Sequence, residues 1–243
     1  MSSVRYLGHG TVLVELDGAR LVTDPLLRRR VGHLLRATGV DPPGELDAVL
    51  ISHAHRDHLD LPSVELIDPT VPVVLPRGLG RLLKGRANVV EIDVGEEIAF
   101  GGVTVRATEA VHGGSRPGGR ASGPALGYAI TGSRRIYFAG DTDLFDGMEG
   151  LVPDLDLALI PIWGWGPSLG RGLHLDPARA VEAIKLLRPR IAVPIHWGTY
   201  RPLHRGPGAW FLREPAKTFA REASARAPDV EVRVLQPGEQ LEL

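Results

Sequence analysis

The stretch Ser52-His53-Ala54-His55-Arg56-Asp57-His58 is the most informative part of this chain of 243 residues. It places four side chains that can bind a metal ion within six residues, and three of them belong to the nine histidines of the chain. The apolar run Ala48–Ile51 precedes it directly, which is typical of a strand buried on both faces. Because a polar loop with incidental histidines would rarely concentrate them in this way, the stretch predicts a metal site at a strand end.

The spacing within the stretch suggests two metal ions. His53 and His55 are two residues apart, so in an extended segment their imidazoles face the same way and can bind one ion together. Asp57 and His58 lie where the chain turns toward a helix expected near Leu61, and they can face a second ion. Neutral imidazole and carboxylate are good ligands for Zn²⁺, Mn²⁺ and Fe²⁺.

Four groups cannot complete two coordination spheres and leave room for water, so further ligands must come from elsewhere. Three candidates stand at the ends of apolar runs and beside glycines: His112 before Gly113, Asp141 after Gly140, and His196 two residues before Gly198. A fixed backbone with space beside it suits a ligand. Each residue alone could instead be a capping or core polar group, but together they favour the metal site.

The remaining pattern predicts an α/β fold. Apolar runs bounded by turn residues predict strands at Val4–Leu7, Thr11–Leu16, Arg20–Thr23, Val73–Leu75, Val89–Ile92, Val103–Ala107, Leu126–Thr131, Ile136–Ala139, Leu157–Pro161 and Ile191–Ile195. Helices are expected from Asp60 with Pro62 in the first turn, from Asp176 to before Pro189, and over Pro215–Ala225. Both halves are rich in strands and then helical, so we expect a four-layer αββα sandwich: two sheets packed face to face with helices outside. No composition shift marks a boundary, and residues 1–243 are expected to form one domain.

Composition excludes several classes of function. The net charge of -1 gives no overall field toward nucleic acid, so no nucleic-acid partner is expected. The chain has no cysteine, which excludes thiolate metal sites and cysteine nucleophiles. No apolar stretch reaches the roughly 18 residues of a membrane span. Charged residues within the first 17 positions argue against a signal peptide, so we expect a cytoplasmic protein.

The order of these residues resembles the ligand series of the metallo-β-lactamase superfamily: His-x-His-x-Asp-His, then a lone His, a Gly-Asp and a final His. Within the superfamily, the sequence resembles the branch of the L-ascorbate-6-phosphate lactonases and N-acyl-phosphatidylethanolamine phospholipase D. The resemblance covers nearly the whole chain, and its matching segments are Gly8-His9-Gly10-Thr11-Val12, Thr23-Asp24-Pro25, Leu50-Ile51-Ser52-His53, Phe138-Ala139-Gly140-Asp141-Thr142, His174-Leu175-Asp176-Pro177 and Ile195-His196-Trp197-Gly198-Thr199.

The resemblance implies a role for each ligand. His53, His55 and His112 would bind the first metal ion. Asp57, His58 and His196 would bind the second, and Asp141 would bridge both. Zinc is the commonest metal in the superfamily, and manganese and iron also occur.

Such a centre implies a hydrolase acting on a small-molecule substrate. A hydroxide that bridges the two ions would attack a phosphodiester or a lactone or ester bond, with Asp57 orienting it. His174, just before the expected helix at Asp176, is either a general acid for the leaving group or a residue that supports the helix start. The alternative functions are an RNA- or DNA-processing nuclease, a single-iron persulfide dioxygenase, and a non-catalytic metal-binding member of the superfamily. β-Lactam hydrolysis is possible by fold.

Several other side chains are expected to surround the centre. His9 and Asp24 would support the ligands, with Asp24 accepting the second N–H of a metal-bound histidine. The four tryptophans are Trp163, Trp165, Trp197 and Trp210, and three of them flank the expected site loops. They would either wall a substrate pocket or pack in the core. Arg116 and Arg120 lie near His112 and could meet a phosphate or remain in solvent.

Overall fold

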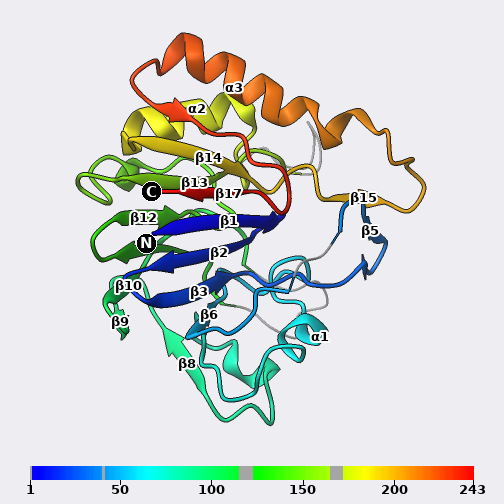
Figure 1. Cartoon of the computed structure of the whole chain (residues 1–243), viewed down its shortest axis with the longest axis vertical. Coiled ribbons are helices and arrows are strands. Elements are labelled where there is room, and N and C mark those ends of the chain that lie inside the picture. Colours follow the sequence, from blue (N-terminus) through cyan, green and yellow to red (C-terminus); the bar gives the residue numbers. More distant parts are fainter. Residues whose placement is uncertain (1, 40–41, 115–122, 165–171) are drawn as a thin grey trace.

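Two seven-stranded sheets form the body of the protein in the computed structural model, which describes residues 2–39, 42–114, 123–164 and 172–243 (Figure 1). The first sheet has the order β17 (Gln240–Glu242), β1 (Ser3–Gly8), β2 (Thr11–Leu16), β3 (Ala19–Thr23), β6 (Ala48–Leu50), β7 (Val73–Pro76), β8 (Val89–Ile92). The second has the order β16 (Glu231–Val232), β14 (Ile191–Ile195), β13 (Leu157–Pro161), β12 (Arg135–Phe138), β11 (Leu126–Thr131), β10 (Val103–Glu109), β9 (Glu97–Phe100). A small third sheet has the order β15 (Tyr200–Pro202), β5 (Leu34–Arg36), β4 (Arg30–Val31).

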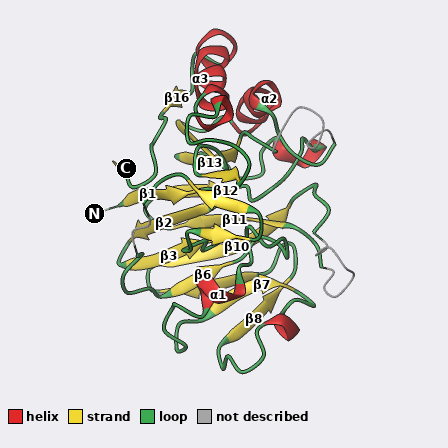
Figure 2. Cartoon of the chain, turned by 90° about the vertical axis from the view of Figure 1, so that its right-hand side faces the viewer, coloured by secondary structure: helices red, strands yellow, loops and turns green. Residues whose placement is uncertain are grey.

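Helices lie outside the two large sheets, which gives the predicted αββα sandwich (Figure 2). Within the described ranges the α-helices are α1 (Leu61–Val64), α2 (Pro177–Leu187) and α3 (Glu214–Arg226), and the 3₁₀ helices are η1 (Gly80–Leu82), η2 (Asp146–Met148) and η3 (Trp210–Leu212). Helices α2 and α3 lie on the β13 side of the molecule, and α1 lies on the β6 side. The helix starts agree with the sequence, because the side chains of Asp60 and Asp176 cap α1 and α2 by accepting backbone N–H groups.

The strand that leads to the histidine-rich stretch is buried on both faces, as its sequence predicts. Ala48 and Leu50 belong to the core between the two sheets, and Val49 and Ile51 belong to a second cluster under α1. Successive side chains alternate because the strand has a period of two residues. Each of the larger side chains contributes roughly 1.5–3 kcal/mol by its burial, so the stretch from Ser52 to His58 leaves a rigid part of the molecule.

Strand direction brings the predicted ligands to one edge of each sheet. In the first sheet β1 and β3 both run antiparallel to β2, and β3 is parallel to β6. In the second sheet β10 and β12 both run antiparallel to β11, and β12, β13 and β14 are parallel. The carboxyl ends of these strands therefore share an edge in each sheet. His9, Asp24, the stretch at 53–58, His112, Asp141 and His196 follow β1, β3, β6, β10, β12 and β14, respectively.

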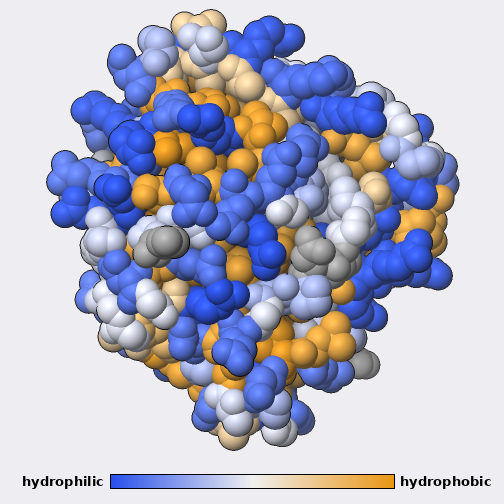
Figure 3. All heavy atoms as spheres, viewed as in Figure 1, coloured by the Kyte–Doolittle hydropathy of each residue, from blue (hydrophilic) through white to orange (hydrophobic). Residues whose placement is uncertain are grey.

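Hydrophilic and hydrophobic residues both contribute to the surface of the described chain (Figure 3). Figure 3 shows hydrophobic residues lying between hydrophilic ones on this face. Among the helices that the structure describes, none combines the length and the apolar character needed to cross a bilayer.

Candidate metal centre

His53, His55 and His112 form the first group of donors. His55 Nδ1 lies 2.9 Å from His53 Nε2 and 3.1 Å from His112 Nε2. Two of these residues come from the loop after β6 and the third from the loop after β10, so the group joins the two sheets. Two nitrogens bound to one tetrahedral ion at about 2.0–2.1 Å lie roughly 3.3 Å apart, and the observed spacing fits a shared ion after a small adjustment.

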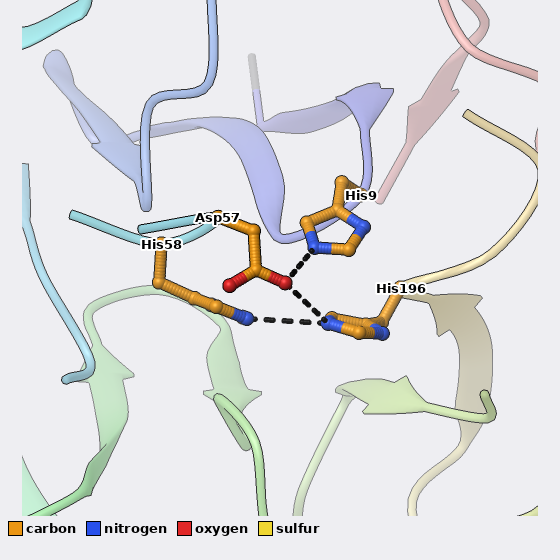
Figure 4. A group of neighbouring side chains, drawn as sticks. All are labelled: His9, Asp57, His58 and His196. Carbon is orange, nitrogen blue, oxygen red and sulfur yellow. Dashed lines mark hydrogen bonds and ion pairs between the residues drawn. The ribbon is translucent and has the colours of Figure 1, made fainter. Parts of the chain in front are cut away.

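Asp57, His58 and His196 form the second group, together with His9 (Figure 4). His58 Nε2 and His196 Nε2 are 3.2 Å apart, and Asp57 Oδ2 lies 3.9 Å from His196 Nε2. His58 and His196 are buried, whereas the Asp57 side chain is 21% exposed. This group also joins the two sheets, because His196 follows β14.

Asp141 lies between the two groups. Its Oδ2 is 3.2 Å from His58 Nε2 and 4.0 Å from both His53 Nε2 and His112 Nε2. Its Oδ1 is 3.4 Å from His196 Nε2, is buried, and has no hydrogen-bond partner among the described residues. A buried carboxylate oxygen without such a partner is costly. A cation between the groups would satisfy it.

The other ring nitrogens have partners that fix which nitrogen faces the centre. His58 Nδ1 lies 2.7 Å from Asp24 Oδ2, His196 Nδ1 2.6 Å from the carbonyl of Trp163, and His112 Nδ1 2.7 Å from the carbonyl of Leu173. These oxygens accept hydrogen bonds, so each Nδ1 carries the hydrogen and each Nε2 of a neutral ring presents a lone pair. Ring nitrogens turned toward one another in this way leave a place that either a proton or a metal cation can fill.

The pKa values of the site also indicate a place for a positive charge. Burial holds the pKa of His53 well below its usual value and lowers that of His112, and it lowers the pKa of His196 to about 3, so these three rings are neutral near pH 7. His58 differs. Burial would lower its pKa, but the carboxylates of Asp141 and Asp24 raise it well above the usual value. In the metal-free protein a proton on His58 thus supplies the positive charge that a metal ion would bring.

We expect the metal-free protein to lose stability as the pH falls below about 6.5, the ordinary histidine pKa. There the unfolded chain binds protons at His53, His112 and His196 that the folded chain does not bind. The loss approaches about 1.4 kcal/mol per pH unit for each such ring. His58 affects the free energy of unfolding in the opposite direction. The stability that it contributes is fully present below its pKa in the unfolded chain and is lost as the pH rises through its raised pKa in the folded chain.

Urea unfolding of the chelator-treated protein, measured at several pH values between about 6.5 and 4.5, tests this linkage. A free energy of unfolding that stays level or rises on acidification would show that these rings are not held neutral.

The backbone is strained where it delivers these side chains. His9, Asp24 and His196 have positive φ angles of 58°, 33° and 61°, which are uncommon outside glycine. Gly140, with φ 61°, precedes Asp141, and a Cβ there would lie 2.8 Å from the carbonyl oxygen of Leu126. Only glycine allows this approach. Close packing therefore requires glycine at the position before Asp141, which agrees with the sequence pattern of a ligand beside a glycine.

His174 lies at the centre. Its Nε2 is 3.1 Å from Asp141 Oδ2, its ring centroid is 4.5 Å from that of His112, and its side chain is 14% exposed. The helix start that it could have supported is capped by Asp176 instead. The structure thus brings all the residues proposed from the sequence for metal binding and catalysis into one cluster.

The residues that were expected to surround the centre lie in different environments. Asp24 is fully buried and accepts hydrogen bonds from Ser52 as well as from His58, a supporting contact that the sequence only partly indicated. Trp197 is buried in the main core, whereas Trp163 and the exposed Trp210 pack edge to face beside the site with ring centroids 5.5 Å apart. Trp165, Arg116 and Arg120 lie outside the described residues.

Comparisons with known proteins agree with this geometry. The model of the beta-lactamase superfamily domain matches residues 19–197. A UPF0173 metal-dependent hydrolase of Thermus thermophilus is 36% identical over the full length of both chains. The N-acyl-phosphatidylethanolamine-hydrolyzing phospholipase D 1 of Caenorhabditis elegans is 36% identical over 80% of this chain and 63% of its own. The structure of a metallo hydrolase from Ignicoccus hospitalis superposes with a TM-score of 0.73 at 24% identity, covering 100% of this chain and 99% of that one, and shows a shared fold.

Proposed function

The chain belongs to the beta-lactamase superfamily and is similar over its whole length to UPF0173 metal-dependent hydrolases, and on that premise we propose that it cleaves a phosphodiester or a lactone or ester bond of a small metabolite with two bound divalent metal ions. The observation that carries the proposal is the approach of the Nε2 atoms of His58 and His196, which lie 3.2 Å apart and beside the carboxylate of Asp141. This arrangement is a site for a cation.

The donors divide into two sets in this proposal. His53, His55 and His112 would hold one ion, Asp57, His58 and His196 would hold the other, and Asp141, which lies between the two groups, would serve both. Zinc suits a set of imidazole and carboxylate ligands, and manganese and iron suit it as well. When bound, the two cations supply a water molecule that ionises near neutral pH and a positive charge for the developing oxyanion.

The chain's own residues then position the reactants. Asp57 is the most exposed ligand of the second set, so its carboxylate is placed to accept a hydrogen bond from the attacking water. His174 stands across the centre with Nε2 beside Asp141, and it donates a proton to the oxygen that leaves. The absence of cysteine agrees with direct attack by water.

Two observations bear on the substrate. The relative from Caenorhabditis elegans is named for hydrolysing a phospholipid, which supports a phosphodiester as the bond cleaved here. The carbonyl of Trp163 holds His196, and the ring of Trp163 packs against Trp210 and Phe211. This aromatic cluster beside the donors favours a substrate with an apolar group near the scissile bond.

The test combines metal analysis with a substrate panel. We expect two divalent ions per chain and hydrolysis of bis(p-nitrophenyl) phosphate, of lactones or of thioesters, which a chelator abolishes and added metal restores. One iron per chain would favour the dioxygenase chemistry, and cleavage of oligonucleotides alone would favour a nuclease. A protein that keeps its full stability without metal and cleaves nothing would be a non-catalytic member.

A further inference from the structure

His9 stands beside the second donor set without belonging to the ligand series found in the sequence. It follows β1 with a φ of 58°, and it is buried. Its backbone N–H donates to Thr199 Oγ1 over 2.8 Å, and its carbonyl accepts the N–H of His196 over 2.8 Å. The backbone of His9 is therefore fixed to the loop that carries a metal donor from the opposite sheet.

The side chain of His9 reaches Asp57. His9 Nε2 lies 3.1 Å from Asp57 Oδ2, and the imidazole packs over the ring of His196 with centroids 3.8 Å apart and planes tilted by 38°. In Figure 4 the dashed line from His9 ends on the Asp57 carboxylate, whereas His196 is connected to both His58 and Asp57. His9 thus contacts one donor by a hydrogen bond and a second by ring packing.

The chemistry of this pair decides what His9 contributes. An ionised carboxylate only accepts hydrogen bonds, so the hydrogen between the two residues resides on His9 Nε2. An Nε2 that carries this hydrogen has no lone pair to give to a metal ion. His9 is therefore a donor to a ligand, although its position would allow it to be counted as a ligand itself.

Asp57 is the donor that most needs such support. Its side chain is 21% exposed, whereas those of His58, His196 and Asp141 are 1–3% exposed.

We propose that His9 is the positioning residue of the second metal subsite: its Nε2–H holds the Asp57 carboxylate toward His58 and His196, and its backbone carbonyl holds His196. The inference rests on the proposed function, because it takes the second donor set to bind a metal ion. It adds a residue outside the ligand series on which the affinity of that one ion depends.

The experiment compares His9→Leu with His9→Gln. Leucine removes the donor at a similar size, whereas the glutamine amide nitrogen lies the same number of bonds from Cα as Nε2 and keeps an N–H there. His204→Leu, which removes an exposed imidazole elsewhere, is the matched control. The readouts are the affinities of both cations, titrated against a chromophoric chelator, and the visible spectrum of the cobalt-loaded proteins. The thermal midpoint of each metal-free protein monitors folding.

We expect His9→Leu to bind the second cation about 10- to 100-fold more weakly, the usual effect of removing a partner of a metal ligand, and to bind the first as the parent does. His9→Gln should recover most of that affinity, and His204→Leu should match the parent. The cobalt spectrum of the second site should shift in His9→Leu alone.

Three outcomes would overturn the inference. Unchanged affinity in His9→Leu would show that Asp57 needs no positioning. Equal losses in both His9 variants would make His9 a ligand. Parallel loss of both cations with a lower metal-free midpoint would make its role purely structural. A parent protein that binds fewer than two ions would refute the proposed function itself, which separates the two failures.

Discussion

The Asp141→Asn protein is expected to fold and to lose its paired metal ions together with its hydrolytic activity. Asp141 lies near both donor groups, with His58 Nε2 at 3.2 Å and His53 and His112 Nε2 at 4.0 Å. Asparagine keeps its shape but removes the charge. Loss of an outer partner alone weakens metal binding 10- to 100-fold, so loss of a bridging ligand should weaken it by more than about 100-fold and lower kcat/KM to match.

Asp143→Asn is the matched control for this variant. Asp143 is also buried and lies two residues further along the same loop, but its carboxylate pairs with Arg179 and accepts the N–H of Leu144. This variant should keep both metal ions. Metal content and kcat/KM measured on the two variants test whether Asp141 bridges the two donor groups. An Asp141→Asn protein with two ions and parental activity would refute this role.

The second large effect is a loss of folding stability that we expect when Asp24 is replaced. Asp24 is fully buried, and its carboxylate accepts the backbone N–H of Ser52, the hydroxyl of Ser52 and the Nδ1–H of His58. Asp24→Ala leaves three buried donors without their acceptor. Breaking a buried charged pair of this kind costs about 3–5 kcal/mol, and we expect the free energy of unfolding of the metal-free protein to fall by that amount.

Denaturant unfolding measures this loss, with the exposed Asp229→Ala as a control expected to change stability by less than about 0.5 kcal/mol. Asp24→Asn serves where the alanine protein fails to fold, because it restores one acceptor and should lie between the alanine variant and the parent. An alanine variant as stable as the parent would mean that these hydrogen bonds do not hold the loop at Ser52.

The sequence predicted the parts of the site that follow strong strands. The runs Arg20–Thr23, Ile136–Ala139 and Ile191–Ile195 are strands whose bounds lie within one residue of those expected from their composition. Strands of one sheet that run in the same direction end at the same edge, so a residue placed after such a strand lies at that edge whatever the loops do. The αββα arrangement follows from the same alternation and is confirmed.

Other parts depend on contacts that leave no local pattern. The strands β4, β5, β15, β16 and β17 have two or three residues each, too few for an alternation to be recognised. The backbone carbonyls of Trp163 and Leu173, which orient His196 and His112, carry no side-chain signal at all. The contact between His9 and Asp57 joins residues 48 positions apart and depends on a strained φ at His9.

The most direct measurement is anomalous diffraction from crystals of the metal-loaded protein, recorded on both sides of the absorption edge of the metal. The account predicts two peaks about 3.5–4 Å apart, one bound by His53, His55 and His112 and the other by Asp57, His58 and His196, with Asp141 in contact with both. A single peak, or a peak away from these side chains, would contradict it.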